Sequence, residues 1–484
     1  MAANRGADYD RATIIAHRRE VLMLCRSARF FLLLPLLAAV PCAARDLYVH
    51  PTLGDERNDG LAAEADGAGH GPVKTIHRAV RYALPGDTVH LAKLDEPYHE
   101  SPVFHDRICP ADKPITLDGH GATITGAERM DLATWENVAP GRYRKVALLP
   151  RIDAAIVGRW FFRINGRMQH MGRTSKGPSL PLKKPEELQP EEWTFITDEN
   201  AFYVQIEPTK SPGDYVIEAP MRSAGVQISG RNENIVIRNL NTQHVYNDGF
   251  NIHGYCRGVV FENVSAVECG DDGISAHDDC RIKVDGFTSI GNSTGFCHTN
   301  ASHSDSNRVL IRDCLGFDVF VLDTGRHTLT NSLVFSSASS SVVVLGPRPD
   351  KEGKTPPGTC TLETENTAVV RRGKNTSLRW MRGAVVLMKN SAIVGFDLTV
   401  DADVLKLDDS VVGSLAERRN KLTVGAMTKA TGAGSLVDVD LTGWPAGSTK
   451  PRPAILKFRE PFDGSLVAPA EFTGGVDSAM LPKP

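Results

Sequence analysis

The stretch that decides the fold reads, in register, VQIS (226–229), FNIH (250–253), ISAH (274–277), FCHT (296–299), FVLD (320–323) and VVVL (342–345). Each segment alternates inward and outward positions with a period of two, which is typical of a β-strand. The residue before each segment recurs at nearly constant spacings of 24, 24, 22, 24 and 22 residues. These residues are Gly225, Gly249, Gly273, Gly295, Val319 and Ser341.

A second apolar series runs between these segments, for example at Ile235 and Ile237 and again at Val259 and Phe261. Each repeat therefore carries two strands and no helix, with Gly or Asn at its corners. Repeats of this length and content are typical of a parallel β-solenoid, whereas leucine-rich repeats need an L-x-x-L-x-L frame that is absent here. We predict an all-β fold, a single-stranded right-handed parallel β-helix (β-solenoid) with one coil per repeat.

The remaining sequence predicts a cap and an insertion around these coils. The segment 75–84 places apolar residues on one face of a helix, which would cover the open end of the solenoid. Between 127 and 220 the repeat is lost and aromatic residues concentrate, which indicates a β-rich insertion. The predicted division is 1–44 signal peptide, 45–126 N-terminal helical cap and first coils, 127–220 insertion, 221–345 regular coils with the candidate site, and 346–484 less regular C-terminal coils and tail.

The first 44 residues differ in composition from the rest of the chain. An apolar run, Phe30–Val40, follows Arg26 and Arg29 and precedes the small residues of Cys42-Ala43-Ala44, as in a secretory signal peptide. Met23 is an alternative start of translation. The apolar run is too short to span a bilayer comfortably. We therefore expect a secreted or periplasmic protein with no stable membrane insertion after signal removal.

The overall composition is that of a globular protein, with 484 residues, 41% of them hydrophobic, and a formal net charge of −3. No basic patch with interleaved aromatics stands out, so we expect no nucleic-acid partner. Removing Cys25 and Cys42 with the signal would leave an odd number of cysteines. Cys256 and Cys280 occupy the same place in adjacent repeats, so they are either bridged or stacked as buried thiols. We expect a monomer.

Polar and titratable residues gather only on the middle coils. Adjacent coils stack about 4.8 Å apart, which brings the turn and strand after Asn247 beside those after Asp271. Carboxylates this close disfavour joint ionisation, so one of them keeps its proton and can act as an acid. The predicted catalytic residues are Asp248, Asp271, Asp272 and His277. The predicted substrate-binding residues are Asn247, Asn251, His253, Ser275, His298 and Asp323.

The same residues have a structural explanation. N-D-G and D-D-G are favourable turn sequences, and solenoids stack Asn or Asp side chains for structural reasons. His253 and His277 could be two solvated or mutually hydrogen-bonded surface histidines. Strict alternation turns His298 inward, beside Ile252 and Ala276, whereas a one-residue bulge would place it next to His277.

Two segments one coil apart carry a family resemblance. Y-N-D-G-F-N-I (246–252) and G-D-D-G-I-S (270–275) resemble the N-T-D and D-D motifs of polygalacturonases, which belong to the pectin-lyase-like β-helix superfamily. The resemblance implies that Asp248, Asp271 and Asp272 are the acid and base carboxylates of an inverting hydrolase. The family's G-H-G on the next coil is missing unless His298 substitutes for it. F-F-R-I-N-G-R-M (161–168), together with Arg173, is similar to segments in other exported β-helix glycoside hydrolases.

Three functions are compatible with this pattern. The leading one is an exported glycoside hydrolase that acts on a polysaccharide or oligosaccharide and needs no metal or cofactor. The second is a polysaccharide lyase on the same scaffold, with Ca²⁺ held by oxygen ligands and a basic side chain as the proton acceptor. Its Ca²⁺ ligands would be Asp248, Asp271, Asp272 and Asp278, and its base one of His253, His277, Arg281 and Lys283. The third is a non-catalytic surface protein whose polar column only binds glycan.

Overall fold

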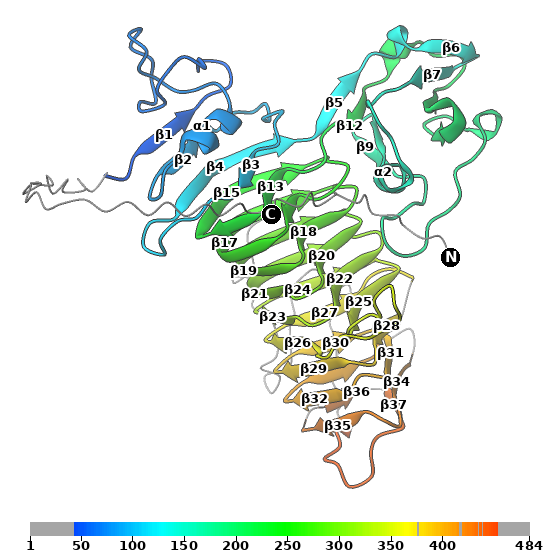
Figure 1. Ribbon diagram of the computed structural model, residues 1–484. Helices are drawn as coiled ribbons and strands as arrows, with labels where there is room; N and C mark the ends of the chain where they lie inside the picture. Colours follow the sequence, from blue (N-terminus) through cyan, green and yellow to red (C-terminus); the bar gives the residue numbers. More distant parts are fainter. Residues whose placement is uncertain (1–42, 375–376, 416–418, 434, 438, 454–484) are drawn as a thin grey trace, which may run out of the picture. The chain divides into compact units, whose positions relative to one another are not determined.

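The computed structural model describes residues 43–453, apart from 375–376, 416–418, 434 and 438. The described chain is mostly β-strand and forms long parallel sheets (Figure 1). The predicted signal peptide lies almost entirely outside the described residues. Within the described part, no helix is long and apolar enough to span a bilayer.

Two parallel sheets run through the chain, one of 19 strands and one of 11 strands. Here the larger is called sheet A and the smaller sheet B. Sheet A contains β1 (Asp46–Val49), β2 (Thr88–Leu91), β4 (Ile115–Thr125), β14 (Arg231–Glu233), β15 (Ile235–Gln243), β17 (Tyr255–Val267), β19 (Asp279–Ile290), β21 (His303–Arg312), β23 (Arg326–Thr330), β24 (Leu333–Ser336), β26 (Cys360–Glu365), β27 (Ala368–Arg371), β29 (Ala384–Lys389), β30 (Ala392–Val394), β32 (Val404–Asp408), β33 (Val411–Gly413), β35 (Lys429–Gly432), β36 (Ser435–Val437) and β38 (Arg452–Pro453). Sheet B contains β3 (Val103–His105), β13 (Val226–Ser229), β16 (Phe250–Ile252), β18 (Asp272–Ala276), β20 (Thr294–His298), β22 (Phe317–Leu322), β25 (Ser340–Leu345), β28 (Ser377–Trp380), β31 (Asp397–Val400), β34 (Asn420–Val424) and β37 (Val439–Thr442).

From β13 onward the chain alternates between sheet B and sheet A, and equivalent strands of successive repeats pair in parallel. In sheet B, Val226 is the register partner of Phe250, and Phe250 is the partner of Ile274. Ile274 in turn pairs with Phe296. The first four copies of the repeated segment are thus aligned as the sequence pattern predicts.

The register changes at the fifth copy. Phe296 pairs with Val319, and not with Phe320 as the pattern predicted. Val319 and Val321 are buried, whereas Phe320 points to the other face and stacks on Phe317 at a centroid distance of 4.7 Å. The predicted alignment was wrong by one residue at this copy, because an aromatic residue on the outer face looked like a core residue. The sixth copy is again aligned as predicted, since Val319 pairs with Val342.

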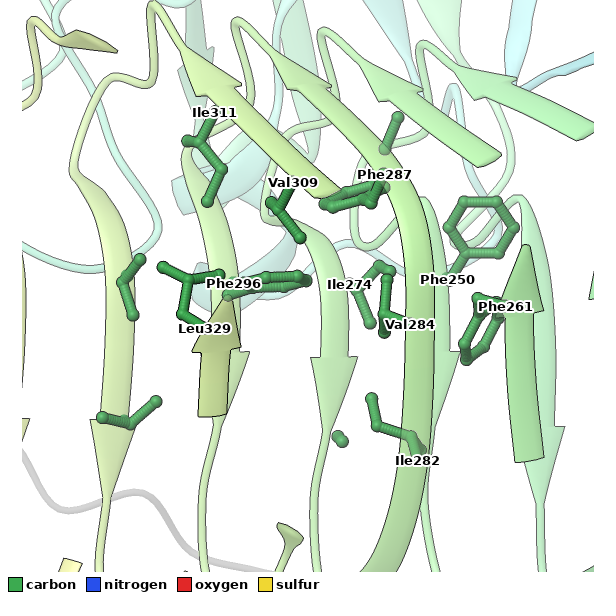
Figure 2. Packing of buried hydrophobic residues seen from close by; sticks show 14 of the residues in the cluster. Phe250, Phe261, Ile274, Ile282, Val284, Phe287, Phe296, Val309, Ile311 and Leu329 are labelled. Atoms are coloured by element: carbon green, nitrogen blue, oxygen red, sulfur yellow. The ribbon is translucent and has the colours of Figure 1, made fainter. Parts of the chain in front are cut away.

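The inward side chains of both sheets form one continuous apolar cluster (Figure 2). Phe250 of sheet B meets Phe261 of sheet A at a centroid distance of 5.3 Å. One repeat further on, Phe287 meets Phe296 at 5.2 Å. Full burial of one such ring stabilises the fold by about 1.5–3 kcal/mol, so this cluster is the main source of stability.

Asparagines with a left-handed backbone line one corner of the repeats. Asn331, Asn366 and Asn390 each have a φ of 46–48°. Their side-chain amides are connected from one repeat to the next, since Asn390 donates to Asn366 at 2.5 Å and Asn366 donates to Asn331 at 3.1 Å. Asn331 donates to Asn307 at 2.8 Å, and Asn307 donates to the Asp285 carboxylate at 2.8 Å. The corner residues satisfy one another as the repeats stack.

A short helix, α1 (Ile76–Tyr82), packs beside the first strands. The Thr75 hydroxyl accepts a hydrogen bond from the Arg78 amide, which begins the helix. Ile76, Ala79 and Val80 are buried on one face. The helix predicted over 75–84 is therefore present but shorter, since the backbone is already extended at Ala83, two residues before Pro85.

Residues 127–220 form two four-stranded antiparallel sheets and a short helix, α2 (Ala154–Arg159). The strands are β5 (Ala127–Met130), β6 (Glu136–Ala139), β7 (Arg142–Val146), β8 (Phe162–Ile164), β9 (Arg167–Gln169), β10 (Trp193–Ile196), β11 (Ala201–Gln205) and β12 (Ile217–Pro220). Buried aromatic rings give this part its own apolar cluster, with Trp160 stacked on Phe202 at 4.9 Å. This segment, which we call the insertion, supplies side chains to the site described next.

Candidate functional site

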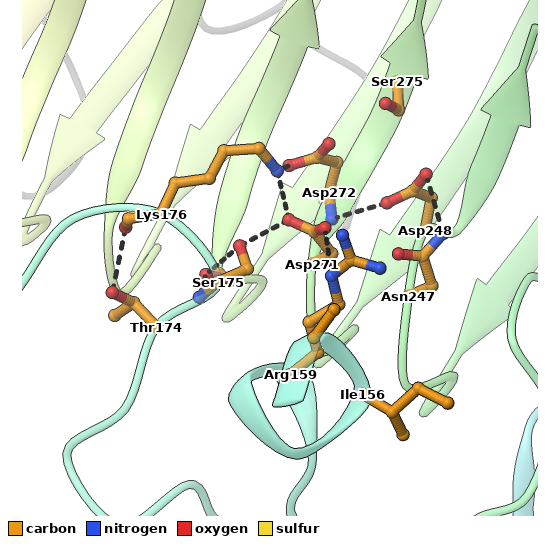
Figure 3. Close-up of polar contacts among 12 residues, drawn as sticks. Ile156, Arg159, Thr174, Ser175, Lys176, Asn247, Asp248, Asp271, Asp272 and Ser275 are labelled. Atoms are coloured by element: carbon orange, nitrogen blue, oxygen red, sulfur yellow. Dashed lines mark hydrogen bonds and ion pairs between the residues drawn. The ribbon is translucent and has the colours of Figure 1, made fainter. Parts of the chain in front are cut away.

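Three aspartates of neighbouring repeats converge at the start of strands in sheet B (Figure 3). Asp248 precedes β16, and Asp271 and Asp272 lie at the equivalent place before and at the start of β18. The Asp272 amide donates a hydrogen bond to Asp248 Oδ1 at 3.1 Å. One oxygen from each carboxyl group lies within 4.8 Å of the others, and each residue is at most 3% exposed. The register of the repeat therefore brings these predicted residues together.

Two cations from the insertion neutralise this cluster. Lys176 Nζ lies 2.7 Å from Asp272 Oδ1 and also contacts Asp271 Oδ1. Arg159 Nε lies 2.8 Å from Asp271 Oδ2. The Ser175 hydroxyl donates to Asp271 as well, and its amide donates to Ser293 at 2.9 Å. Both oxygens of Asp271 are therefore engaged by protein groups.

The sequence interpretation did not include Lys176 or Arg159 among the site residues. Their positions in the insertion follow no repeat, so spacing could not place them beside the aspartates. The one available signal was charge, because three buried carboxylates need nearby cations to be stable. Arg173, which the resemblance singled out, donates to the Leu180 carbonyl at 2.8 Å and so shapes the loop that carries Lys176.

The electrostatic surroundings separate the pKa values of the three carboxyl groups. Burial and the Asp271 charge raise the pKa of Asp272 to about 7. Burial also acts on Asp271, but Lys176 and Arg159 outweigh it and lower its pKa to about 2. Burial, together with the charges of Asp272 and Asp271, raises the pKa of Asp248 well above its usual value. Near neutral pH the cluster thus holds a protonated or half-protonated acid beside an ionised carboxylate.

Close packing between the insertion and the repeats fixes this arrangement. A Cβ atom on Gly270 would lie 2.0 Å from the Arg159 carbonyl oxygen, so only glycine lets the end of α2 approach Asp271. Trp160 of the insertion stacks on Tyr246, two residues before Asp248, at 5.9 Å. The Asn247 amide group donates to Asp248 Oδ2 at 3.1 Å. The insertion and the aspartate turns therefore form one packed unit.

The two predicted histidines stack on each other next to the carboxylates. The rings of His253 and His277 lie 4.5 Å apart with an angle of 2° between their planes. His277 shares hydrogen bonds with Ser275 Oγ at 2.6 Å and Thr299 Oγ1 at 2.7 Å. Burial and the neighbouring His253 lower the pKa of His277 to about 4, so its ring is neutral at pH 7. His277 is thus held as a neutral hydrogen-bonding group.

Two further side chains on the outer face of sheet B belong to this surface. Asn251 is 9% exposed, and its buried Oδ1 has no hydrogen-bond partner among the described residues. Cys297 was not predicted, but its sulfur lies within 4.8 Å of ligand atoms of both Asp272 and His277. Burial raises the pKa of the Cys297 thiol well above its usual value, so the group is a neutral thiol.

The structure separates two predicted residues from the cluster. His298 points inward in register with Ala276 and lies 5.3 Å from the His327 ring, so the alternative with a bulge beside His277 is wrong. Asp323 follows the register change, adopts a φ of 74°, and forms an ion pair with Arg348 at 2.7 Å. It also accepts a hydrogen bond from the Asn300 amide at 2.9 Å.

The cluster is poorly suited to Ca²⁺ in this conformation. An ion held by Asp248, Asp271 and Asp272 would have to displace Lys176 and Arg159, which already bind carboxylate oxygens of Asp271 and Asp272. The fourth expected ligand, Asp278, accepts a hydrogen bond from the Gly254 amide at 2.9 Å and lies 3.8 Å from His253. The donor set therefore differs from the predicted lyase site.

No family model and no curated protein sequence matches this chain. Among solved structures, the complex of XylC with xylose is similar at 10% identity and a TM-score of 0.40, covering 86% of this chain and 88% of the other. A second structure, described as a glycoside hydrolase, is similar at 8% identity and a TM-score of 0.47, covering 84% of this chain and 99% of the other. Both similarities are too low to assign a family.

Proposed function

We propose that the chain is an exported right-handed parallel β-helix that hydrolyses glycosidic bonds in a polysaccharide or oligosaccharide. The observation that carries this proposal is the opposite perturbation of two adjacent buried carboxyl groups. Asp272 has its pKa raised to about 7 by burial and the Asp271 charge, while Asp271 has its pKa lowered to about 2 as its cationic partners outweigh burial. A proton donor beside an ionised carboxylate is the arrangement that glycoside hydrolysis requires.

In the proposed reaction, Asp272 protonates the leaving glycosidic oxygen as the bond to the anomeric carbon breaks. The Asp271 carboxylate attacks that carbon and forms a covalent glycosyl ester. Asp272, now ionised, then removes a proton from water, which hydrolyses the ester and regenerates both groups. Carboxyl oxygens within 4.8 Å are closer than the roughly 6.5–9.5 Å of inverting enzymes, so we propose retention rather than the inversion that the polygalacturonase resemblance implied.

Substrate access needs a movement of the insertion. The three aspartates are at most 3% exposed, and the insertion contacts two of them, since Ser175 and Lys176 bind Asp271 and Lys176 also binds Asp272 (Figure 3). Lys176 is the side chain that must leave, since it contacts both Asp271 and Asp272. A sugar hydroxyl can then replace the Lys176 ammonium group as the hydrogen-bond donor to the carboxylates. His253 and His277 lie next to these carboxylates.

The test is a screen of the purified mature protein against neutral and acidic polysaccharides, followed by variants on any glycan that is cleaved. Asp272→Asn and Asp271→Asn should each lower kcat by about 10²–10⁴-fold. Asp285→Asn, on sheet A and paired with Arg308, is the matched control and should retain activity. NMR of the first-formed sugar should show retained anomeric configuration. Cleavage at the wild-type rate by both site variants would overturn the assignment.

A non-catalytic glycan-binding protein is the second candidate, and the burial of all three aspartates favours it. In that case the carboxylates and their cations only hold the insertion to the repeats. Glycan binding without cleavage by the wild type, unchanged in Asp272→Asn, would support this alternative. A product with a new ultraviolet-absorbing double bond, lost on chelation, would instead indicate a Ca²⁺-dependent lyase.

A further inference from the structure

A pair of histidines on the first strands of sheet A has the features of a metal site, far along the chain from the aspartate cluster. His90 lies on β2 and His120 on β4, two strands that pair in parallel with His90 opposite Asp118. His90 Nδ1 and His120 Nε2 are 2.9 Å apart, and the ring centroids are 5.2 Å apart with planes at 19°. The distance between the ring centroids exceeds the distance between the two nitrogens by about two ring radii. Each nitrogen therefore lies on the side of its ring that faces the other ring.

The tautomer of His90 is set by a carboxylate on a third strand. His90 Nε2 lies 2.8 Å from Asp46 Oδ1 on β1. A carboxylate there keeps the proton on Nε2 and leaves a lone pair on Nδ1, directed at His120. Metal-binding histidines commonly donate their second ring nitrogen to a carboxylate in this way. His120 Nε2 then donates the 2.9 Å hydrogen bond to this lone pair. When the His120 proton lies instead on Nδ1, which is 3.6 Å from Asp118 Oδ1, two imidazole lone pairs can converge on one ion, with Asp46 as the outer partner.

We propose that His90 and His120 bind a divalent transition metal such as Zn²⁺, with Asp46 as the positioning residue. Zn–N bonds of about 2.0–2.1 Å in a tetrahedral site place two ligand nitrogens roughly 3.3–3.4 Å apart. The present 2.9 Å separation has to open by only about half an ångström to admit the ion. The His120 side chain is 47% exposed, so it has room to turn.

The remaining coordination positions are filled by water or by a rotated carboxylate. Asp118 has an oxygen within 4.8 Å of both histidine nitrogens. That carboxylate already binds Arg238 at 2.7 Å and Asn239 at 3.1 Å, so it is the weaker candidate for direct ligation. Imidazole ligands with few oxygens suit Zn²⁺, Cu²⁺ and Ni²⁺ better than Ca²⁺ or Mg²⁺.

A metal here would link β1, β2 and β4 across the first strands of the sheet. Binding to the folded protein alone raises its stability by mass action, by an amount that grows with the ratio of free metal to Kd. This inference does not depend on the proposed hydrolase activity.

The experiment is titration of the untagged, EDTA-treated mature protein with ZnCl₂, followed by calorimetry and thermal unfolding. We expect one Zn²⁺ bound at this site and a rise in Tm with added metal. His90→Ala and His120→Ala should each weaken this binding by at least about tenfold, and Asp46→Asn by about 10–100-fold. His105→Ala, an exposed histidine beside Asp106 without a second histidine, is the matched control and should bind as the wild type does.

Unchanged Tm of all variants without metal would show that they fold. Absence of a metal-dependent Tm rise in the wild type would overturn the proposal. Binding by His90→Ala and His120→Ala with the same affinity as the His105→Ala control would overturn it equally.

Discussion

Lys176 Nζ lies 2.7 Å from Asp272 Oδ1 although 96 residues separate them in the sequence. The lysine comes from the loop after β9 and the aspartate from the first position of β18. This contact decides the protonation of the site, since the ammonium group opposes the effect of burial and of Asp271 on the Asp272 carboxyl group.

Replacement of Lys176 by methionine should therefore shift the alkaline limb of the pH–rate profile to higher pH. The Asp272 pKa, about 7 in the native protein, rises further when the ammonium group is removed, so the acid stays protonated to higher pH. The measurement is kcat/KM between pH 5 and 9 on a glycan that the wild type cleaves. Lys176→Arg keeps the charge and should leave the limb near the native position. A shift of the alkaline limb to lower pH in Lys176→Met would contradict the assignment of Asp272 as the acid.

Two glycines near α2 should respond in opposite ways to alanine. Gly270→Ala places a Cβ 2.0 Å from the Arg159 carbonyl oxygen, so we expect a loss of about 1–3 kcal/mol or more in the free energy of unfolding. Gly158 lies inside α2, and a Cβ added there would meet no atom within 4 Å, so Gly158→Ala should stabilise by about 0.5–1 kcal/mol. Urea unfolding gives the free energy of unfolding of both variants. Equal changes in the two variants would show that the Gly270 position has room for a Cβ atom.

Acid should destabilise the protein through two buried histidines. Burial, with a smaller contribution from the neighbouring His277, lowers the pKa of His298 to about 3, and burial lowers that of His327 well below 6.5. Because the folded pKa is below the unfolded value, the unfolded chain binds more protons, and stability falls as the pH drops from about 6.5 toward 3.

His298→Leu should remove part of this acid sensitivity, by about 3 kcal/mol between pH 7 and pH 4. Urea midpoints at both pH values give the comparison, with exposed His105→Leu as control. If the wild type and His298→Leu lose the same stability on acidification, His298 is already protonated in the folded state or hydrogen-bonded differently.

Cys256 and Cys280 should both be free thiols. They are register partners on β17 and β19, buried and unbridged. Denaturation without reductant followed by alkylation should label both residues, as judged by peptide mass spectrometry. Labelling of the native protein should be slow, because neither residue is exposed. A linked peptide pair of these two residues would contradict the structure.

The strand alignment could be predicted where one residue type recurred at one place. Gly249 and Gly273 mark equivalent turns, so the pairing of Phe250 with Ile274 followed directly from the sequence. The alignment was predicted wrongly at Phe320, because its outward ring is as hydrophobic as an inward one. A pattern of period two distinguishes the two faces but does not identify which of them is buried.

Only the candidate-site residues that lie on the repeats could be predicted from the sequence. Asp248, Asp271 and Asp272 come together because neighbouring repeats stack in register. Arg159 and Lys176 come from an insertion whose own aromatic core sets its path, so no spacing relates them to the aspartates. The burial of Asn251 and Ser275 was also hidden in the sequence, since outward residues of a strand are exposed unless another segment covers them.

The side-chain dipoles of the corner asparagines point the same way along the stacked repeats. Asn390, Asn366 and Asn331 each donate to the asparagine amide one repeat nearer the N-terminus, so the side-chain dipoles add, as peptide dipoles do in a helix. The positive end of this row meets the Asp285 carboxylate, whose pKa is lowered by hydrogen bonds from Arg308 and Asn307. Parallel strands alone produce only a small net dipole, so this one edge of the protein is polarised by its side chains.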